Sequence, residues 1–289
     1  MHDYPALEAL AEIIRRGSFE AAAARLGVTP SAVSQRIKGL EEKLGVVLIR
    51  RGTPATGTAA GLRLMQHLDQ VRLLEASLDA GICPGGQPPV VRIAINADSL
   101  ATWFLPAMTA LPALYDLIVD DQDHARDWLE QGTVSAAITS DPQPVPGCDV
   151  TALGRMRYLA LASPDFTARY FPRGVTTAAL EAAPTVFFNR KDALQTHWAE
   201  RVSGGRPRLS GHYIPASEPF ARALTFGLGW GMVPEGMARA EVLAGRLQPL
   251  DDSLPLDVPL YWQVARTMKA ALHKLTSAVK EKAAAELRP

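Results

Sequence analysis

The chain has 289 residues, 47% of them hydrophobic and 21% charged, enough for two or three domains with buried cores. Thirty basic residues balance thirty acidic ones, which argues against indiscriminate coating of nucleic acid, and no apolar run reaches the ~18 residues of a membrane span. The N-terminus lacks a signal pattern, and Cys83 and Cys148 form neither a metal framework nor a disulfide scaffold, so we expect a cytoplasmic protein.

The start of the chain predicts three short helices separated by glycine turns. Residues 5–16 carry apolar side chains at helical spacing, and this first helix is expected to end at Gly17. Ser18 is a good N-cap for the second helix. Thr29 caps the third helix, and Pro30 occupies its first turn, where the missing N–H costs nothing.

The third helix, residues 30–44, has an apolar stripe and a polar face. The expected stripe consists of Val33, Ile37, Leu40 and Leu44. The opposite face carries Ser31, Ser34, Gln35 and Lys38. These side chains have the length that reaches base edges and phosphates in a major groove, whereas an ordinary surface helix would present mostly glutamate and lysine. Two helices joined by a short turn, the second with such a face, predict a helix-turn-helix.

A hairpin and a long helix are expected to follow. The run VVLIRRGTPATGT predicts a short wing whose Arg50 and Arg51 meet phosphates or enter the minor groove. Thr58 then caps a helix over residues 59–79. Its expected seam consists of Leu64, Val71, Leu74 and Leu78, with His67 as an interface histidine. This seam favours pairing with a second copy of the chain.

A glycine- and proline-rich hinge at residues 80–89 separates this part from the rest of the chain. Beyond the hinge, the apolar runs VVRIAI, YDLIV, VSAAIT, RYLALA and TVFF alternate with helical stretches. Such alternation favours an α/β domain with mostly parallel strands. Ligands of such domains bind beyond the carboxyl ends of the strands, at helix N-termini.

Polar side chains near these strand ends are candidates for ligand binding. Ser99 and Ser217 each open a predicted helix, so a hydroxyl and backbone N–H groups there can hold a carboxylate; the alternative is simple helix capping. Four aspartates form an acidic group suited to an ammonium or guanidinium: Asp98, Asp120, Asp121 and Asp123. They are otherwise surface caps. Thr139, at the end of VSAAIT, is a weaker candidate. Four tryptophans are expected to pack in the core instead of forming ligand walls: Trp103, Trp128, Trp230 and Trp262.

The sequence contains no recognisable catalytic constellation. A P-loop, a G-x-S-x-G elbow and an H-E-x-x-H helix are all absent. The six histidines are scattered without metal-ligand spacing, and the aspartates do not follow EF-hand offsets. We therefore expect neither an enzyme nor a bound metal or cofactor.

The segment SFEAAAARLGVTPSAVSQRIKGLEEKLG resembles the winged helix-turn-helix of LysR-type transcriptional regulators. One departure is Ile49, where the family more often has phenylalanine, a change from one apolar side chain to another. The resemblance implies a winged helix-turn-helix (residues 1–58) and a linker helix (59–79), followed by a two-lobed α/β effector domain (90–289) like a periplasmic solute-binding protein. Lobe I would comprise residues 90–161 and 265–289, and lobe II residues 162–264.

The family resemblance also implies partners. The protein would bind an inverted-repeat operator in double-stranded DNA as a homodimer or homotetramer, and would influence RNA polymerase. The expected DNA contacts are Thr29, Pro30, Ser31, Ser34, Gln35, Arg36, Lys38, Arg50 and Arg51.

The runs NADSLATWFLP, DDQDH, SEPFARA and GLGWGMVPE resemble the lysine- and arginine-responsive branch of that family. This implies a basic amino acid as effector, L-lysine first, and control of an amino-acid exporter or metabolism gene. Two alternatives stay open: a regulator of this family with another effector, such as an aromatic or organic acid, and a solute-binding module whose first eighty residues serve only dimerisation.

Overall fold

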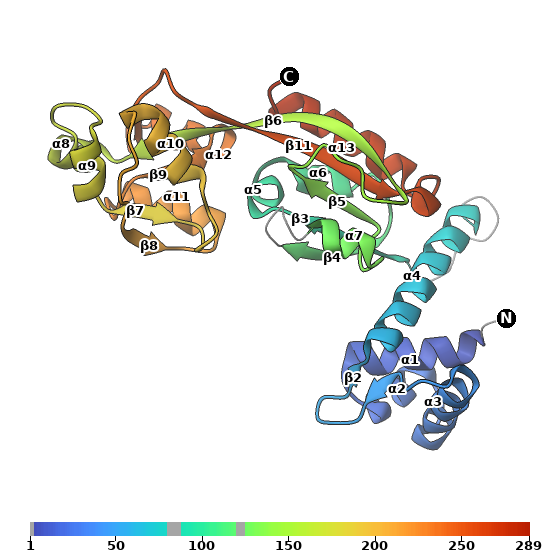
Figure 1. Ribbon diagram of the computed structural model, residues 1–289. Coiled ribbons are helices and arrows are strands. Elements are labelled where there is room, and N and C mark those ends of the chain that lie inside the picture. The colour runs from blue at the N-terminus through green and yellow to red at the C-terminus, as the bar shows by residue number, and fades with distance from the viewer. Residues whose placement is uncertain (1–2, 80–87, 120–124) are drawn as a thin grey trace.

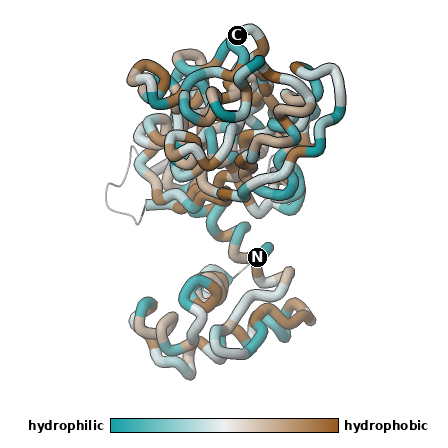
Figure 2. Tube along the Cα trace, turned by 90° about the vertical axis from the view of Figure 1, so that its left-hand side faces the viewer, coloured by the Kyte–Doolittle hydropathy of each residue, from teal (hydrophilic) through white to brown (hydrophobic). Residues whose placement is uncertain are grey.

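The computed structural model describes residues 3–79, 88–119 and 125–289 of the chain. A small helical head at the N-terminus connects through one long helix, α4, to a larger two-lobed part (Figure 1). Viewed from the side, α4 is the narrow bridge between these two parts (Figure 2). None of the helices in the described ranges is both long and apolar enough to cross a membrane.

Three helices build the head, and the predicted caps begin and end them. They are α1 (Tyr4–Arg16), α2 (Phe19–Leu26) and α3 (Pro30–Leu44). Ser18 and Thr29 each accept a hydrogen bond of 3.2 Å from a backbone N–H of the following helix, which satisfies a donor that the helix itself leaves unpaired. Gly17 ends α1 at a φ of 69°, in the left-handed region that glycine adopts without steric cost.

Helix α3 packs on the other two helices through its apolar stripe. Val33, Ile37 and Leu40 belong to the head core. Leu44, also expected in this stripe, is instead 37% exposed, because the last turn of α3 extends beyond the core cluster. The stripe is therefore one residue shorter than the sequence pattern predicts.

The wing and the long helix follow as predicted. Strands β1 (Ile49–Arg50) and β2 (Thr56–Gly57) form an antiparallel hairpin, and α4 spans Ala59–Asp79. The Thr58 hydroxyl accepts from the N–H of Gly61 at 3.2 Å and donates to the carbonyl of Val47 at 2.8 Å. It thus caps α4 and fastens the helix to the wing.

The expected seam of α4 is divided between two cores of the same chain. Leu64 packs against the head core, whereas Leu74 packs against the core of the larger part. Val71 is half-buried, and the side chain of Leu78 lies outside the described residues. Within one chain, α4 therefore joins the two parts by burying a different apolar side chain in each.

Lobe I begins with three parallel strands, β3 (Val90–Ile95), β4 (Leu114–Val119) and β5 (Ala136–Thr139), with β3 in the centre. The other elements of this lobe are α5 (Ala97–Ser99), the π-helix η1 (Leu100–Phe104), α6 (Leu105–Met108), α7 (Ala125–Glu130), the 3₁₀ turn η2 (Arg266–Met268) and α13 (His273–Glu286). Helix α13 packs on α6 and η1, so the end of the chain returns to lobe I.

Two long strands, β6 (Cys148–Ala162) and β11 (Leu256–Ala265), run antiparallel through both lobes (Figure 1). In lobe I, β11 pairs with β5; in lobe II, β6 pairs with β9 (Gly231–Pro234) and β10 (Gln248–Pro249). All these pairings are antiparallel, so the expectation of mostly parallel strands holds only for β3, β4 and β5 and for the pair β7–β8. Pairing of β6 with β9 already begins at Tyr158, before the boundary that we expected at residue 162.

Lobe II carries the remaining elements. They are α8 (Pro164–Tyr170), α9 (Thr177–Ala182), β7 (Thr185–Phe187), α10 (Leu194–Ser203), β8 (Gly211–Tyr213), α11 (Ser217–Thr225) and α12 (Glu235–Leu243). The rings of Trp198 and Trp230 lie 5.1 Å apart, and both side chains are fully buried. The expectation that Trp103, Trp230 and Trp262 pack in the core is confirmed, and Trp198, which we had not singled out, joins them there.

Close packing of α4 on the wing depends on Gly61. A methyl group at this position would clash with the carbonyl oxygen of Leu48. We expect Gly61→Ala to destabilise the head by about 1–3 kcal/mol, because backbone must shift to admit the new carbon. The matched control is Gly39→Ala in α3, where a methyl group meets nothing within 4 Å. This control should stabilise the chain by up to about 1 kcal/mol through helix propensity. Urea unfolding followed by circular dichroism measures both, and equal stability of the two variants would contradict the packing.

Candidate nucleic-acid interface and ligand cleft

The predicted polar face of α3 lies at the surface of the head. Ser31, Gln35 and Lys38 are exposed, and Ser34 and Arg36 are half-buried. No other element of the described head covers this face, because α1 and α2 pack on the opposite, apolar side of α3. A helix that projects such side chains fits the dimensions of a DNA major groove.

The first turn of α3 is fixed by its cap. The Thr29 hydroxyl accepts from the N–H of Ala32 and lies 3.0 Å from the Ser31 hydroxyl. At the other end of the face, the Lys38 ammonium lies 3.7 Å from Glu42. This exposed pair contributes little to stability, so Lys38 remains available for a phosphate at small cost.

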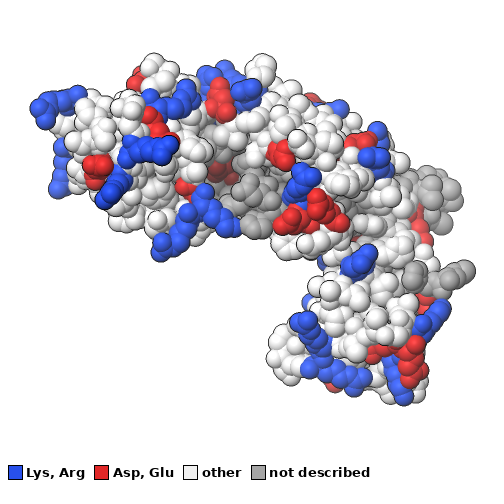
Figure 3. Space-filling model, in the orientation of Figure 1, with Lys and Arg blue, Asp and Glu red and all other residues white. Residues whose placement is uncertain are grey.

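The wing is held beside α3 by Glu41, a residue that we had not singled out from the sequence. Its carboxylate accepts from the N–H groups of Leu48 at 2.7 Å and Ile49 at 3.2 Å. Arg50 is exposed, and the guanidinium of Arg51 lies 5.7 Å from the centre of the Phe19 ring. Figure 3 shows basic side chains along the lower edge of the head, remote from the larger part. The head therefore offers a reading helix and a basic wing together.

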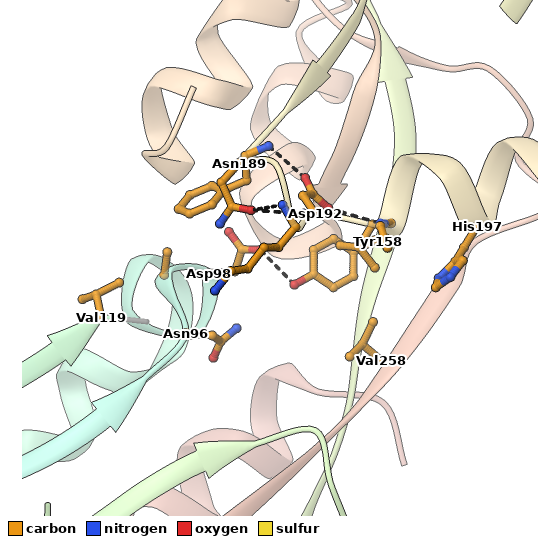
Figure 4. A pocket seen from close by; sticks show the side chains of 13 residues that line it. Asn96, Asp98, Val119, Tyr158, Asn189, Asp192, His197 and Val258 are labelled. Atoms are coloured by element: carbon orange, nitrogen blue, oxygen red, sulfur yellow. Dashed lines mark hydrogen bonds between the residues drawn. The ribbon is translucent and has the colours of Figure 1, made fainter. Parts of the chain in front are cut away.

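The second site is a cavity of about 430 Å³ between the lobes. Its polar side chains come from Asn96 and Asp98 in lobe I, from Tyr158 on the crossing strand β6, and from Asn189, Lys191, Asp192 and His197 in lobe II. Figure 4 shows Asn96, Asp98, Asn189 and Asp192 on one side of this space, with His197 and Val258 on the other. The volume suits a small organic molecule.

Asp98 joins the lobes across this cavity. Its carboxylate accepts hydrogen bonds from the Ser217 hydroxyl of lobe II at 2.7 Å and from the Tyr158 hydroxyl at 2.8 Å. Burial raises the pKa of Asp98 above its ordinary value, although both hydrogen bonds act in the opposite direction. The pKa of Tyr158 is raised well above its usual range by burial and by the charge of Asp98, so this hydroxyl stays protonated as a donor. A bound cation would favour the ionised form of Asp98.

Two polar atoms near Asp98 are buried without a hydrogen-bond partner among the described residues, Asn96 Oδ1 and Ser99 Oγ. Unpaired buried polar atoms are rare, and Asn96 lines the cavity. Ser99 was expected to open a helix, but the helix begins at Ala97, which turns Ser99 away from the cavity lining. Asn96 thus takes the position at the strand end that we had assigned to Ser99.

The structure separates the remaining predicted ligand contacts from one another. Ser217 touches Asp98 instead of lining the cavity itself. Thr139 is buried and does not line the cavity: its hydroxyl donates to the carbonyl of Asp141 at 3.1 Å and accepts from Gln263 at 3.2 Å. Asp120, Asp121 and Asp123 lie outside the described residues.

Sequence reasoning missed the contribution of lobe II, which comes from the segment after β7. The Asp192 carboxylate accepts from the N–H groups of Phe188 at 2.8 Å and Leu194 at 3.1 Å, which fixes a negative charge at the cavity wall. The signal was present, because Asn189 directly follows the apolar run TVFF and Asp192 lies three residues further on, so the strand-end rule applies to this run equally. Within the described ranges, no three His, Cys, Asp or Glu side chains gather as metal ligands.

The raised pKa of Asp98 predicts how stability depends on pH. Since the folded-state pKa lies above the ordinary 3.8, the folded chain binds more protons than the unfolded chain as pH falls from neutral. Ionised Asp98 therefore costs stability at neutral pH, and protonation on acidification removes the cost. We expect Asp98→Asn to melt above the wild type at pH 7.5, with a difference that narrows toward pH 3.8. Thermal unfolding against pH, with Asp252→Asn on the surface of lobe II as control, measures this difference. A difference in melting temperature between Asp98→Asn and the wild type that grows as the pH falls would contradict the burial of an ionised Asp98.

Comparison with known proteins assigns both parts of the chain. Residues 5–62 match the bacterial regulatory helix-turn-helix protein family lysR, and residues 84–284 match the LysR substrate binding domain. The transcriptional regulator ArgP of Pseudomonas aeruginosa is 43% identical, over 96% of this chain and 94% of its own length. The lysine export transcriptional regulatory protein LysG of Corynebacterium glutamicum is 41% identical, over 98% of each chain.

Solved structures agree in fold. The crystal structure of ArgP from Mycobacterium tuberculosis has a TM-score of 0.82 at 40% identity, covering 100% of this chain and 99% of that one. Full-length LysG of Corynebacterium glutamicum with the bound effector Arg has a TM-score of 0.68 at 38% identity, covering 100% of both chains. The relatives are transcriptional regulators and not enzymes. The chain therefore belongs to the LysR family of DNA-binding transcriptional regulators, on the branch that contains ArgP and LysG.

Proposed function

We propose that this regulator senses a basic amino acid, L-arginine or L-lysine, in the cavity between its lobes. The observation that carries the proposal is the pair of carboxylates at the cavity, Asp98 from lobe I and Asp192 from lobe II. Lys191 also lines the cavity, so the three formal charges there sum to minus one. A basic amino acid, with two positive groups and one carboxylate, carries the complementary charge of plus one.

The contacts favour this chemistry over an aromatic or organic acid. An anionic ligand would place its carboxylate near Asp98, whose burial already disfavours negative charge. An ammonium or guanidinium group instead pairs with Asp98 and donates charge-assisted hydrogen bonds to its carboxylate. LysG of Corynebacterium glutamicum, which is similar over the full chain, has been solved with the effector Arg bound. Its name also supports control of amino-acid export, which we extend to this chain.

We further propose that the polar face of α3 contacts base edges while the wing contacts the backbone. The proposed contacts are Thr29, Pro30, Ser31, Ser34, Gln35, Arg36, Lys38, Arg50 and Arg51. One head covers a single half-site, so an inverted-repeat operator with two half-sites requires at least a homodimer. A homotetramer would bind two pairs of half-sites. The protein acts in the cytoplasm, where a ligand-dependent change in the bound DNA alters access for RNA polymerase.

Calorimetry tests the effector. L-arginine and L-lysine should bind, whereas L-histidine and benzoate should bind at least about tenfold more weakly. Asp98→Asn should weaken L-arginine binding by about tenfold or more, because a charged hydrogen bond is worth about 1.5–3 kcal/mol. The matched control is Asp252→Asn, an exposed carboxylate of lobe II, which should bind as the wild type does. Tighter binding of benzoate than of either amino acid would overturn the proposal.

The dependence of DNA binding on salt tests the wing. Arg51→Ala should weaken binding to every duplex and should reduce the slope of log affinity against log salt by about 0.9, the value for one lost phosphate contact. The control is Arg173→Ala, an exposed cation of lobe II far from the head. Fluorescence anisotropy with the DNA upstream of the chain's own gene, and with a scrambled duplex, measures both slopes. An unchanged slope for Arg51→Ala would remove this residue from the phosphate contacts.

A further inference from the structure

A buried carboxylate lies where the head, the linker helix and lobe I meet. Asp69 lies on α4, and its side chain is only 7% exposed. One oxygen, Oδ1, accepts a hydrogen bond from Arg15 of α1, in the head. The other, Oδ2, faces Arg92 of β3, in lobe I. A single side chain of the linker therefore touches a cation from each of the two parts that it connects.

The two halves of this contact are not equally complete. Asp69 Oδ2 lies 3.6 Å from Arg92 Nη1, beyond hydrogen-bond distance, and no donor among the described residues satisfies it. Meanwhile the Nε atom of Arg92 donates to Asp116 on β4 at 2.8 Å. Arg92 thus makes a hydrogen-bonded ion pair within lobe I and a longer ion pair, without a hydrogen bond, to Asp69 of the linker helix. A small shift of β3 relative to α4 would therefore be enough to complete or to break the second contact.

The strands that hold this joint also reach the ligand cavity. β3 begins near Arg92 and ends at Ile95, directly before Asn96 and Asp98 in the cavity lining. β4 carries Asp116 and ends at Val119, which also lines the cavity. The two strands are paired in register from end to end. A displacement of the strand ends on ligand binding is therefore transmitted to Arg92 and Asp116 by rigid sheet.

We propose that Asp69 is the residue that couples occupancy of the cavity to the position of the DNA-binding head. This inference rests on the proposed function, because it assumes a ligand that binds between the lobes. Occupancy changes the contact between Arg92 and Asp69, and the bond from Asp69 to Arg15 transfers the change to α1. Asp69 is a positioning residue in this coupling and touches neither ligand nor DNA.

A neighbouring pair provides the contrast. Arg72 of α4 donates to Glu8 of α1 at 2.8 Å, so it also fastens the linker to the head. The side chains of Arg72 and Glu8 are 33% and 40% exposed, and among the described residues neither makes a hydrogen bond or ion pair with the strands of lobe I. Loss of this pair should loosen the head without cutting the route from the cavity. Glu8→Gln is therefore the matched control for Asp69→Asn.

The experiment measures the ratio of DNA affinities with and without saturating L-arginine, for the full chain on the DNA upstream of its own gene. Asp69→Asn should move this ratio toward one by about 2- to 30-fold, the range for residues along a coupling route. L-arginine affinity of the DNA-free variant should stay within about twofold of the wild type, since Asp69 lies outside the cavity. Glu8→Gln should keep the wild-type ratio.

A second variant keeps the inference testable if Asp69→Asn folds poorly. Arg92→Gln should also move the ratio toward one, and combining it with Asp69→Asn should add nothing, because both changes cut one route. Hydrogen exchange supplies an independent readout: L-arginine should change protection in α1 and α4 of the wild type but not of either variant. A wild type that ignores L-arginine or prefers no DNA contradicts the proposed function as well. A responsive wild type with an equally responsive Asp69→Asn overturns only the coupling role.

Discussion

The antiparallel pair β6–β11 is the constraint on which the rest of the structure depends. Both strands run through both lobes, so each lobe contains part of β6 and part of β11. The cavity must then lie beside this pair, and Tyr158 of β6 and Val258 of β11 line it. Asp98 closes this arrangement, because its bonds to Ser217 and Tyr158 join lobe I to lobe II across the space that a ligand would occupy.

The head is linked to this cleft by structure that is rigid at both ends. Helix α4 buries Met65 and Leu68 in the head core and Leu73 in the core of the larger part. Between these anchors lies Asp69, with an arginine from each side. A buried ion pair such as that of Asp69 contributes little net stability. Removal of one partner is costly, however, because it leaves the other charge buried and unpaired, and this cost favours the arrangement in which Asp69 keeps its arginine partners. Contacts thus run from the cavity lining through β3 and the linker helix to α1 of the head.

Local features were predictable from the sequence, and features that depend on distant residues were not. Gly17, Ser18 and Thr29 act through their own backbone neighbours, so their positions in the sequence were sufficient to locate the helix ends. The strand-end rule pointed to Asp98, which lines the cavity, and to Ser217, which does not line it. The bond between these two side chains spans 119 positions, and no pattern predicted it. Thr139 also stands at a strand end, but its hydroxyl accepts a hydrogen bond from Gln263, which lies 124 positions away in the sequence. The prediction that Leu44 is buried was wrong, because the apolar spacing continues to the end of α3, whereas the head core ends before the last turn of this helix. The contacts of Asp69 join residues of three elements that are distant in the sequence, so no local pattern could predict them.

The central claim is that a basic amino acid binds in the cavity between the lobes and pairs with Asp98. A crystal structure of the full chain grown with L-arginine tests it most directly. The account predicts electron density for the amino acid in the cavity, with a positive group within hydrogen-bond distance of Asp98 and with the bond between Asp98 and Ser217 altered. L-arginine bound elsewhere on the chain, or a cavity that stays empty at a concentration that saturates binding in solution, would contradict the account.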